Sequence, residues 1–215
     1  MFGIFLKSTS DFGKRRQFVW RLIRPFIPPK MRWFFEGHPK VKGQLWVADR
    51  KLLYYTVRTY KPQYCFEIGT WRGGGSTLFI SQALYENGTG KLYTVEIDEN
   101  YFNEARENYQ IYLPHLVPYV EFYLGDYREI YPRILNSVRN VDLLFLDGPE
   151  DASETMEQFN FFLPYMRKGS LLIAHDWFTE KCRLLKPFIE ESVDWEIKKV
   201  LVPPRSLGCA LAIKK

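Results

Sequence analysis

Residues 65–77 read CFEIGTWRGGGST and join an apolar segment to a run of three glycines. The segment YCFEI (64–68) predicts a short strand, and STLFISQALY (76–85) predicts a helix directly after the glycines. Glycines at such a junction let backbone N–H groups and a helix N-terminus approach a ligand closely. Because the glycines stand at 69, 73, 74 and 75, the spacing GxGxxG is not met. This stretch alone is compatible with two interpretations, a turn that binds a nucleotide-like ligand and a turn that is only flexible.

Strand and helix patterns alternate through the rest of the chain. Further strands are predicted at 91–97, 120–124, 141–146 and 170–174, and helices at 44–60, 98–110, 127–135 and 152–166. This alternation predicts an α/β fold with a doubly wound, mostly parallel sheet. WEIKKVLVP (195–203) and GCALAIKK (208–215) are separated by four residues, too few for a parallel crossover. We therefore expect the sheet to end in an antiparallel C-terminal β-hairpin.

Composition and charge indicate one globular domain with an N-terminal extension. The chain has 215 residues, 46% of them hydrophobic, and a formal net charge of +5. We predict a main domain over 43–215 and a basic, aromatic, helical appendage over 1–42. Residues 14–29 have the pattern of an amphipathic helix, which can pack on its own domain, on a second subunit in a homodimer, or on a membrane surface.

The cysteines and the absence of long apolar runs limit the compartment and the class of site. Cys65, Cys182 and Cys209 lie far apart in the sequence, which predicts no structural zinc and favours a reducing, cytoplasmic location. The basic charge alone is weak support for nucleic-acid binding.

Acidic residues follow the predicted strands, where ligands bind in doubly wound sheets. Glu96 ends the second strand and is predicted to accept hydrogen bonds from a ribose diol, whereas the nearby Asp98 is predicted to cap a helix. Asp126 follows the third strand, and it can either accept from an amine such as adenine N6 or cap the next helix.

A second acidic group combines the ends of two later strands. Asp147 and Asp176 are expected to converge, and such a pair either binds a divalent cation or includes a proton acceptor. His175 directly precedes Asp176 in the sequence. It is predicted either to have a structural or substrate-orienting role or to act as a general base.

In this order and spacing, EIGTWRGGGST, TVEID, GD, DLLFLDG and SLLIAHDW resemble class I S-adenosylmethionine-dependent methyltransferases. They are most similar to small O-methyltransferases of the catechol and macrolide-sugar type, which implies a Rossmann-like fold over about residues 44–215. The resemblance implies S-adenosylmethionine as cofactor. It places the following residues around that cofactor: Glu67, Gly69, Thr70, Trp71, Gly73, Gly74, Ser76, Glu96, Ile97, Gly125, Asp126 and Asp147.

The resemblance also implies a catalytic group of Asp147, His175 and Asp176, and Mg²⁺ held by the two aspartates in metal-dependent relatives. Trp177 stands where the catechol type has an asparagine, so Glu150 or water would supply a third metal ligand. Without a metal, the aspartates would orient the acceptor instead. The implied reaction is O-methylation of a small molecule such as a sugar, a phenol or a natural product.

Other functions remain open from the sequence. A nucleic-acid or protein methyltransferase and a catalytically silent cofactor-binding scaffold share the same fold. The strand end LDGPED (146–151) lacks the Asn/Asp-Pro-Pro-Tyr/Phe segment with which amino-methylating relatives grip a base, so nucleic acid is disfavoured. Aromatic residues in the predicted acceptor-binding segments, around 30–42, 114–118, 149–152 and 177–183, predict an acceptor pocket.

Overall fold

One mixed sheet organises the chain, and the computed structural model describes residues 22–148, 151–204 and 206–215. The sheet order is β3-β2-β1-β4-β5-β7-β6, with β1 to β5 parallel and β7 antiparallel to both neighbours. The predicted fold class and terminal hairpin are therefore confirmed. The strands are β1 (Tyr64–Ile68), β2 (Lys91–Glu96), β3 (Val120–Leu124), β4 (Val141–Leu146), β5 (Met166–His175), β6 (Trp195–Leu201) and β7 (Cys209–Lys214).

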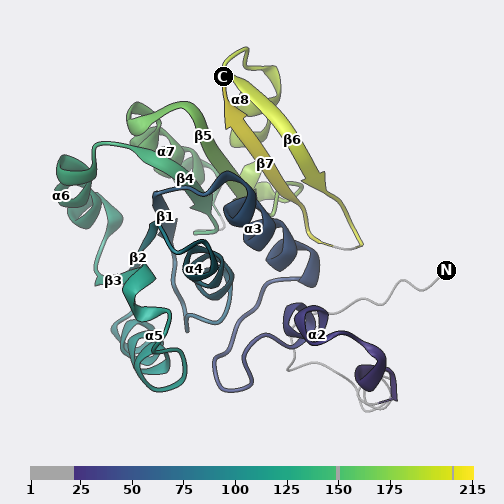
Figure 1. Cartoon of the computed structure of the whole chain (residues 1–215). Coiled ribbons are helices and arrows are strands. Elements are labelled where there is room, and N and C mark those ends of the chain that lie inside the picture. The colour runs from purple at the N-terminus through teal and green to yellow at the C-terminus, as the bar shows by residue number, and fades with distance from the viewer. Residues whose placement is uncertain (1–21, 149–150, 205) are drawn as a thin grey trace.

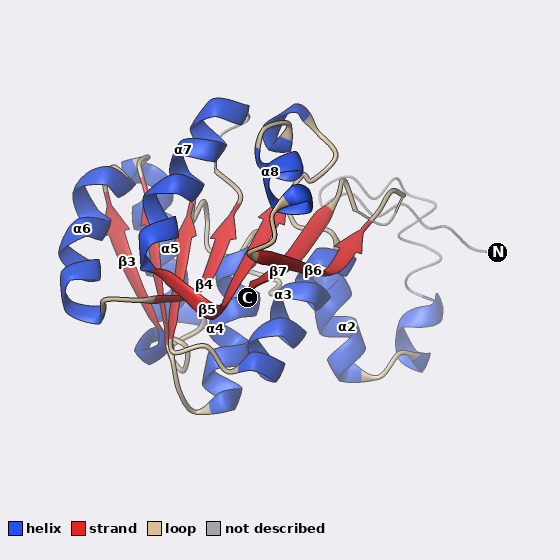
Figure 2. Cartoon of the chain, turned by 90° about the horizontal axis from the view of Figure 1, so that it is seen from above, coloured by secondary structure: helices blue, strands red, loops and turns tan. Residues whose placement is uncertain are grey.

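Helices cover both faces of this sheet, and Figure 2 shows α3 and α4 on one side with α7 and α8 on the other. Successive strand residues serve opposite faces: Cys65 and Leu143 pack in one apolar cluster, while Phe66 and Leu144 pack in the other. Both faces are thus buried, as a parallel sheet requires. The helices are α3 (Val47–Tyr60), α4 (Ser76–Asn87), α5 (Glu99–Tyr112), α6 (Tyr127–Val138), α7 (Ala152–Phe162) and α8 (Leu185–Glu191).

Several predicted boundaries were wrong. Helix α3 begins at Val47 instead of residue 44, α6 continues through Pro132 to Val138, and β5 begins at Met166. The hairpin connection spans 202–208, so it is longer than the sequence indicated. No helix in the described part of the chain has both the length and the apolarity needed to cross a bilayer.

The N-terminal appendage contributes a helix, α2 (Pro29–Glu36), where the sequence analysis expected an acceptor-binding segment. Proline suits the first helical position because its missing N–H would have no partner there. The Phe34 side chain is fully buried against Tyr54 and Phe79, with ring centroids 5.2 and 5.9 Å away. Arg50 Nη1 donates to the Phe34 and Phe35 carbonyls, both at 3.1 Å. The appendage thus shares the domain's core from α2 onward.

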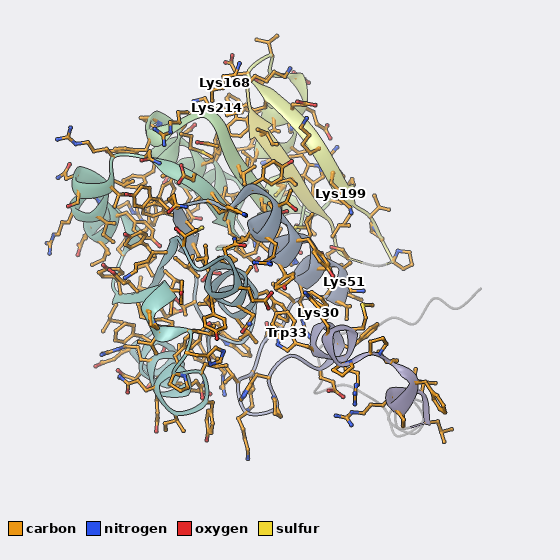
Figure 3. All side chains as sticks on the ribbon, viewed as in Figure 1. Lys30, Trp33, Lys51, Lys168, Lys199 and Lys214 are labelled. Atoms are coloured by element: carbon orange, nitrogen blue, oxygen red, sulfur yellow. The ribbon has the colours of Figure 1, made fainter. Side chains whose placement is uncertain are left out.

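Figure 1 shows α2 beside α3 and α4, and Figure 3 places Lys30 and Trp33 close to Lys51. The ammonium groups of these two lysines lie over aromatic rings, Lys30 above Tyr54 and Lys51 above Phe34. The short helix η1 (Arg24–Phe26) precedes α2. Residues 14–21 of the amphipathic pattern lie outside the described residues, so its membrane or dimer role stays a prediction, as does the domain boundary at 42/43.

The glycine run permits a close crossing of two chain segments. Gly74 N–H donates to the Lys42 carbonyl at 3.0 Å. A Cβ atom at Gly74 would lie 2.2 Å from that same oxygen, and one at Gly43 would lie 1.9 Å from the Gly74 oxygen. Side chains are therefore excluded at both positions by backbone contact, a reason for the glycines that the sequence analysis did not identify.

We predict that Phe34→Ala lowers the free energy of unfolding by about 3–5 kcal/mol, because it empties a buried aromatic site. Phe26→Ala is the matched control, since the Phe26 side chain is 86% exposed. Urea unfolding followed by circular dichroism measures both. Equal midpoints for the two variants would show that α2 is not part of the cooperative core.

Candidate functional site

The carboxyl ends of three adjacent strands, β1, β4 and β5, bring the predicted acids to one edge of the sheet. Gly69 follows β1 with φ +90°, a conformation that favours glycine. A Cβ atom there would lie 3.8 Å from the Asp147 carbonyl oxygen. The glycine turn and the acidic group are therefore neighbours, as the sequence predicted.

Glu67 is a buried carboxyl group beneath the glycine turn. Its Oε2 accepts hydrogen bonds from the hydroxyls of Thr77 at 2.7 Å and Thr94 at 2.8 Å, while Thr70 Oγ1 lies 2.6 Å from the Thr94 hydroxyl. Its Oε1 has no hydrogen-bond partner among the described residues. Burial raises the pKa of Glu67 to about 7. A buried oxygen without a partner fits a ligand that donates a hydrogen bond, such as an amino group.

Glu96 holds the turn together through backbone hydrogen bonds. Its Oε2 accepts from Trp71 N at 2.7 Å, and its Oε1 accepts from the N–H groups of Ile97 and Asp98, both at 3.0 Å. A carboxylate has about four acceptor sites, so the predicted ribose contact is compatible with these bonds. Asp98 caps α5 by accepting from Asn100 N and Tyr101 N, which confirms its predicted role.

Arg72 points toward α5, a direction that the sequence left undecided. Its Nη1 lies 3.1 Å from Glu104 Oε1. Its guanidinium also lies over the rings of Trp71 and Tyr101, 5.2 and 5.5 Å from their centroids. These contacts orient Arg72 along the outside of the turn.

Asp126, which follows β3, caps the N-terminus of helix α6. Asp126 Oδ1 accepts from Arg128 N at 2.8 Å and from Arg128 Nε at 3.1 Å. Gly125, with φ +137°, donates its N–H to the Glu96 carbonyl at 2.9 Å. The Ile97 side chain is 74% exposed. The cap role is thus observed, and the adenine contact of Asp126 stays a prediction.

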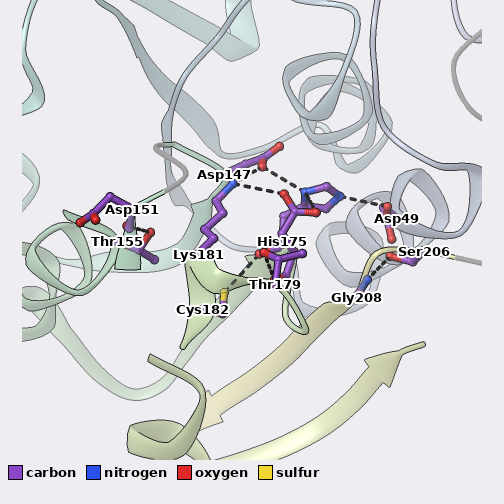
Figure 4. A network of polar contacts seen from close by, with 11 residues as sticks. Asp49, Asp147, Asp151, Thr155, His175, Thr179, Lys181, Cys182, Ser206 and Gly208 are labelled. Atoms are coloured by element: carbon purple, nitrogen blue, oxygen red, sulfur yellow. Dashed lines mark hydrogen bonds and ion pairs between the residues drawn. The ribbon is translucent and has the colours of Figure 1, made fainter. Parts of the chain in front are cut away.

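His175 lies at the centre of three carboxylates (Figure 4). Its Nδ1 is 3.0 Å from Asp147 Oδ1 and 3.3 Å from Asp176 Oδ1, and its Nε2 is 3.1 Å from Asp49 Oδ2. Burial alone would lower the pKa of His175, but its contacts with the carboxylates of Asp147, Asp176 and Asp49 raise it to about 12. His175 is therefore an imidazolium that donates from both ring nitrogens.

Two members of this cluster were missed by the sequence analysis. Asp49 lies on α3 and is fully buried, and Lys181, in the short helix η4 (Glu180–Cys182), is 2% exposed. Lys181 Nζ lies 2.7 Å from Asp147 Oδ1 and 3.6 Å from Asp176 Oδ2. A charged residue within the apolar face of α3 was a usable signal for Asp49. No pattern in the sequence marks Lys181.

The structure separates the remaining candidates. Trp177 is 1% exposed and packs in the core, so it does not offer its ring to an acceptor, whereas Phe178 is 48% exposed. The exposed His115 lies away from the strand ends, with its ring near Tyr85 and Gln82. Glu150, the predicted third metal ligand, lies outside the described residues.

Asp147, His175 and Asp176 have ligand atoms within 4.8 Å of one another, a spacing that suits a metal ion. The hydrogen bonds within this cluster argue against a metal ion. The Lys181 ammonium lies between the two aspartates, and both ring nitrogens of His175 already face carboxylates. As they stand, these residues do not fit a divalent ion.

We predict that Glu67→Gln changes how stability depends on pH. The unfolded glutamate loses its proton near pH 4.5 and the folded one near pH 7. Over this range the folded state binds more protons, so the free energy of unfolding of the original protein falls as pH rises, by at most about 3 kcal/mol. Glutamine does not titrate, so this loss of stability with rising pH is absent from Glu67→Gln.

Urea unfolding at pH 5 and pH 8, without ligand, measures this difference, with Glu157→Gln at an exposed position of α7 as the control. The stability of Glu67→Gln relative to the original protein should rise between pH 5 and pH 8. An unchanged difference would contradict the raised pKa.

A family model and solved structures match this chain. A family model described as a methyltransferase domain matches residues 66–177, more than half of the chain. A comparison with curated proteins gives no match.

Solved structures share the fold. The O-methyltransferase TomG from Streptomyces achromogenes, solved in complex with SAM, is 18% identical with a TM-score of 0.67, over 96% of this chain and 93% of that one. An O-methyltransferase from Bacillus cereus in complex with SAH is 18% identical with a TM-score of 0.68, over 96% and 99%. A methyltransferase from Geobacter sulfurreducens is 18% identical with a TM-score of 0.60, over 92% and 96%.

Proposed function

Since this chain belongs to the methyltransferase-domain family and is an S-adenosylmethionine-dependent methyltransferase, we propose that it methylates a hydroxyl oxygen of a small molecule. The observation that carries this proposal is the Asp147 carboxylate, held beside the glycine turn by two cationic side chains. Methylation of a hydroxyl requires a group that takes up its proton, and a carboxylate can do so.

Asp147 is the member of the cluster best placed to contact an acceptor. Its side chain is 26% exposed, whereas Asp49 is fully buried. The hydrogen bonds that the described residues make to this carboxylate go to Oδ1. Oδ2 is therefore the atom that we assign to the acceptor hydroxyl, where it accepts the hydrogen bond and then the proton.

His175 and Lys181 orient this carboxylate. Both ring nitrogens of His175 face carboxylates, so the ring does not act as the base, and the general-base alternative is disfavoured. The two cations hold the Asp147 side chain in one rotamer, which positions Oδ2 and limits the entropy lost on binding an acceptor. Mg²⁺ has no part in this scheme, because Lys181 lies where the ion would bind.

The residues that we assign to the cofactor lie at or near the carboxyl ends of the same sheet. S-adenosylmethionine supplies an activated methyl group on a sulfonium. We assign the unpartnered Glu67 Oε1 to its amino group, Glu96 to the ribose, and Asp126 to the adenine edge. The TomG structure is a complex with SAM and the Bacillus cereus structure is a complex with SAH, which supports this cofactor choice. A cytoplasmic location stays a prediction.

We predict that Glu96→Ala weakens binding of S-adenosylhomocysteine by at least about tenfold, because it removes the ribose acceptor and releases three backbone N–H groups of the turn. Asp98→Ala is the matched control, two residues along the chain; it removes a helix cap and should cost about 1 kcal/mol of stability with little loss of affinity. Isothermal titration calorimetry measures both. Equal losses would refute the ribose assignment.

The proposed reaction is tested with radiolabelled S-adenosylmethionine and mixtures of sugars, phenols and their amine counterparts. We expect label transfer to hydroxyl compounds and its loss in Asp147→Asn, with S-adenosylhomocysteine binding retained. Transfer to amines, RNA or protein instead would refute the acceptor class. Binding of S-adenosylhomocysteine without label transfer to any acceptor would favour the catalytically silent, cofactor-binding scaffold.

A further inference from the structure

Lys181 is a buried cation whose place in the cluster needs explanation. Its side chain is 2% exposed, and a lysine is rarely so buried unless a negative charge accompanies it. Its ammonium meets two carboxylates, at 2.7 Å from Asp147 Oδ1 and 3.6 Å from Asp176 Oδ2. These are the two acids to which the sequence resemblance assigns a divalent ion.

The segment that carries Lys181 is tied to the sheet on both sides of the lysine. The Asp176 carbonyl accepts from Thr179 N and Thr179 Oγ1, both at 2.9 Å, and Asp176 has φ +56°. Trp177 N–H donates to the Gly208 carbonyl at 3.2 Å, and Cys182 Sγ donates to the His175 carbonyl at 3.3 Å. The backbone at residues 176–182 is thus folded back so that the lysine reaches the acids.

Repulsion between cations gives a second reason. The Lys181 ammonium lies 2.7 Å from Asp147 Oδ1 and 3.6 Å from Asp176 Oδ2. A divalent ion held by the same two carboxylates would stand close to this ammonium, and the repulsion between the two cations would be strong where little water screens them.

We propose that the ammonium group of Lys181 fills the cation position between Asp147 and Asp176, which closes the divalent-ion site that the sequence resemblance implies. Lys181 is a positioning residue in this scheme: it neutralises the acids and fixes Asp147. The consequence for catalysis, that methyl transfer proceeds without a divalent ion, rests on the proposed function. The closure itself does not, because it concerns only how this chain binds cations.

The proposal predicts that removing the ammonium creates a metal site. Lys181→Met keeps an unbranched side chain at the buried position but removes the ammonium group from between the two aspartates. Mn²⁺ accepts the same carboxylate oxygen ligands as Mg²⁺, and its free form gives an electron paramagnetic resonance signal that disappears on binding. We expect no saturable binding by the original protein up to about 1 mM Mn²⁺, and at least about tenfold tighter binding by Lys181→Met.

Three further variants make the result specific. Lys186→Met, on α8 beside the same segment, is the matched control and should not bind Mn²⁺, because Lys186 pairs with Glu190 instead. Lys181→Arg keeps a cation and should keep Mn²⁺ out. Adding Asp147→Asn to Lys181→Met should abolish the new binding.

Two results would overturn the proposal. One is saturable Mn²⁺ binding by the original protein that Asp147→Asn abolishes, and this test holds even if Lys181→Met does not fold. The other is a folded Lys181→Met that binds S-adenosylhomocysteine but no Mn²⁺. Calorimetry of the original protein with S-adenosylhomocysteine in EDTA separates the two claims: absent binding refutes the proposed function and leaves the Mn²⁺ result to decide the closed site.

Discussion

The neutralisation of carboxylates that are crowded together at one edge of the sheet is the constraint on which this site depends. Parallel strands end side by side, so the acids that follow β4 and β5 are forced together. Carboxylates this close repel unless cations accompany them. His175 and Lys181 supply that charge from within the chain, and the segment after β5 is folded so that the lysine reaches its partners.

The N-terminal part of the described chain completes the site from the opposite side. Helix α3 places Asp49 against His175 Nε2, and Arg50, the next residue, holds the carbonyls at the end of α2. Residues 41–44 then cross directly over the glycine turn, where Gly43 and Gly74 exclude side chains. The appendage, the turn and the acidic cluster therefore form one connected unit, and a change in α2 should be felt at the ligand edge.

The glycine run illustrates how one residue type can meet two demands. Gly69 has the positive φ that the turn requires and lies beside Asp147, so its role is at the ligand edge. A glycine is needed at position 74 because the chain segment 41–44 crosses close to its backbone. Gly73 lies against the Tyr109 ring, which a Cβ atom would approach to 3.0 Å. Local spacing cannot distinguish these reasons, because each depends on which distant segment lies opposite.

The sequence by itself determined the α/β class, the strand positions, the terminal hairpin and the strand-end acids Glu96, Asp147 and Asp176. These follow from local periodicity and from the rule that ligands meet the carboxyl ends of parallel strands. Only the tertiary structure decided that His175 is enclosed by carboxylates and that Lys181 stands between them. Those contacts join residues as much as 126 positions apart, and local patterns carry no information about such pairings. The charge state of the site is therefore a property of the folded chain.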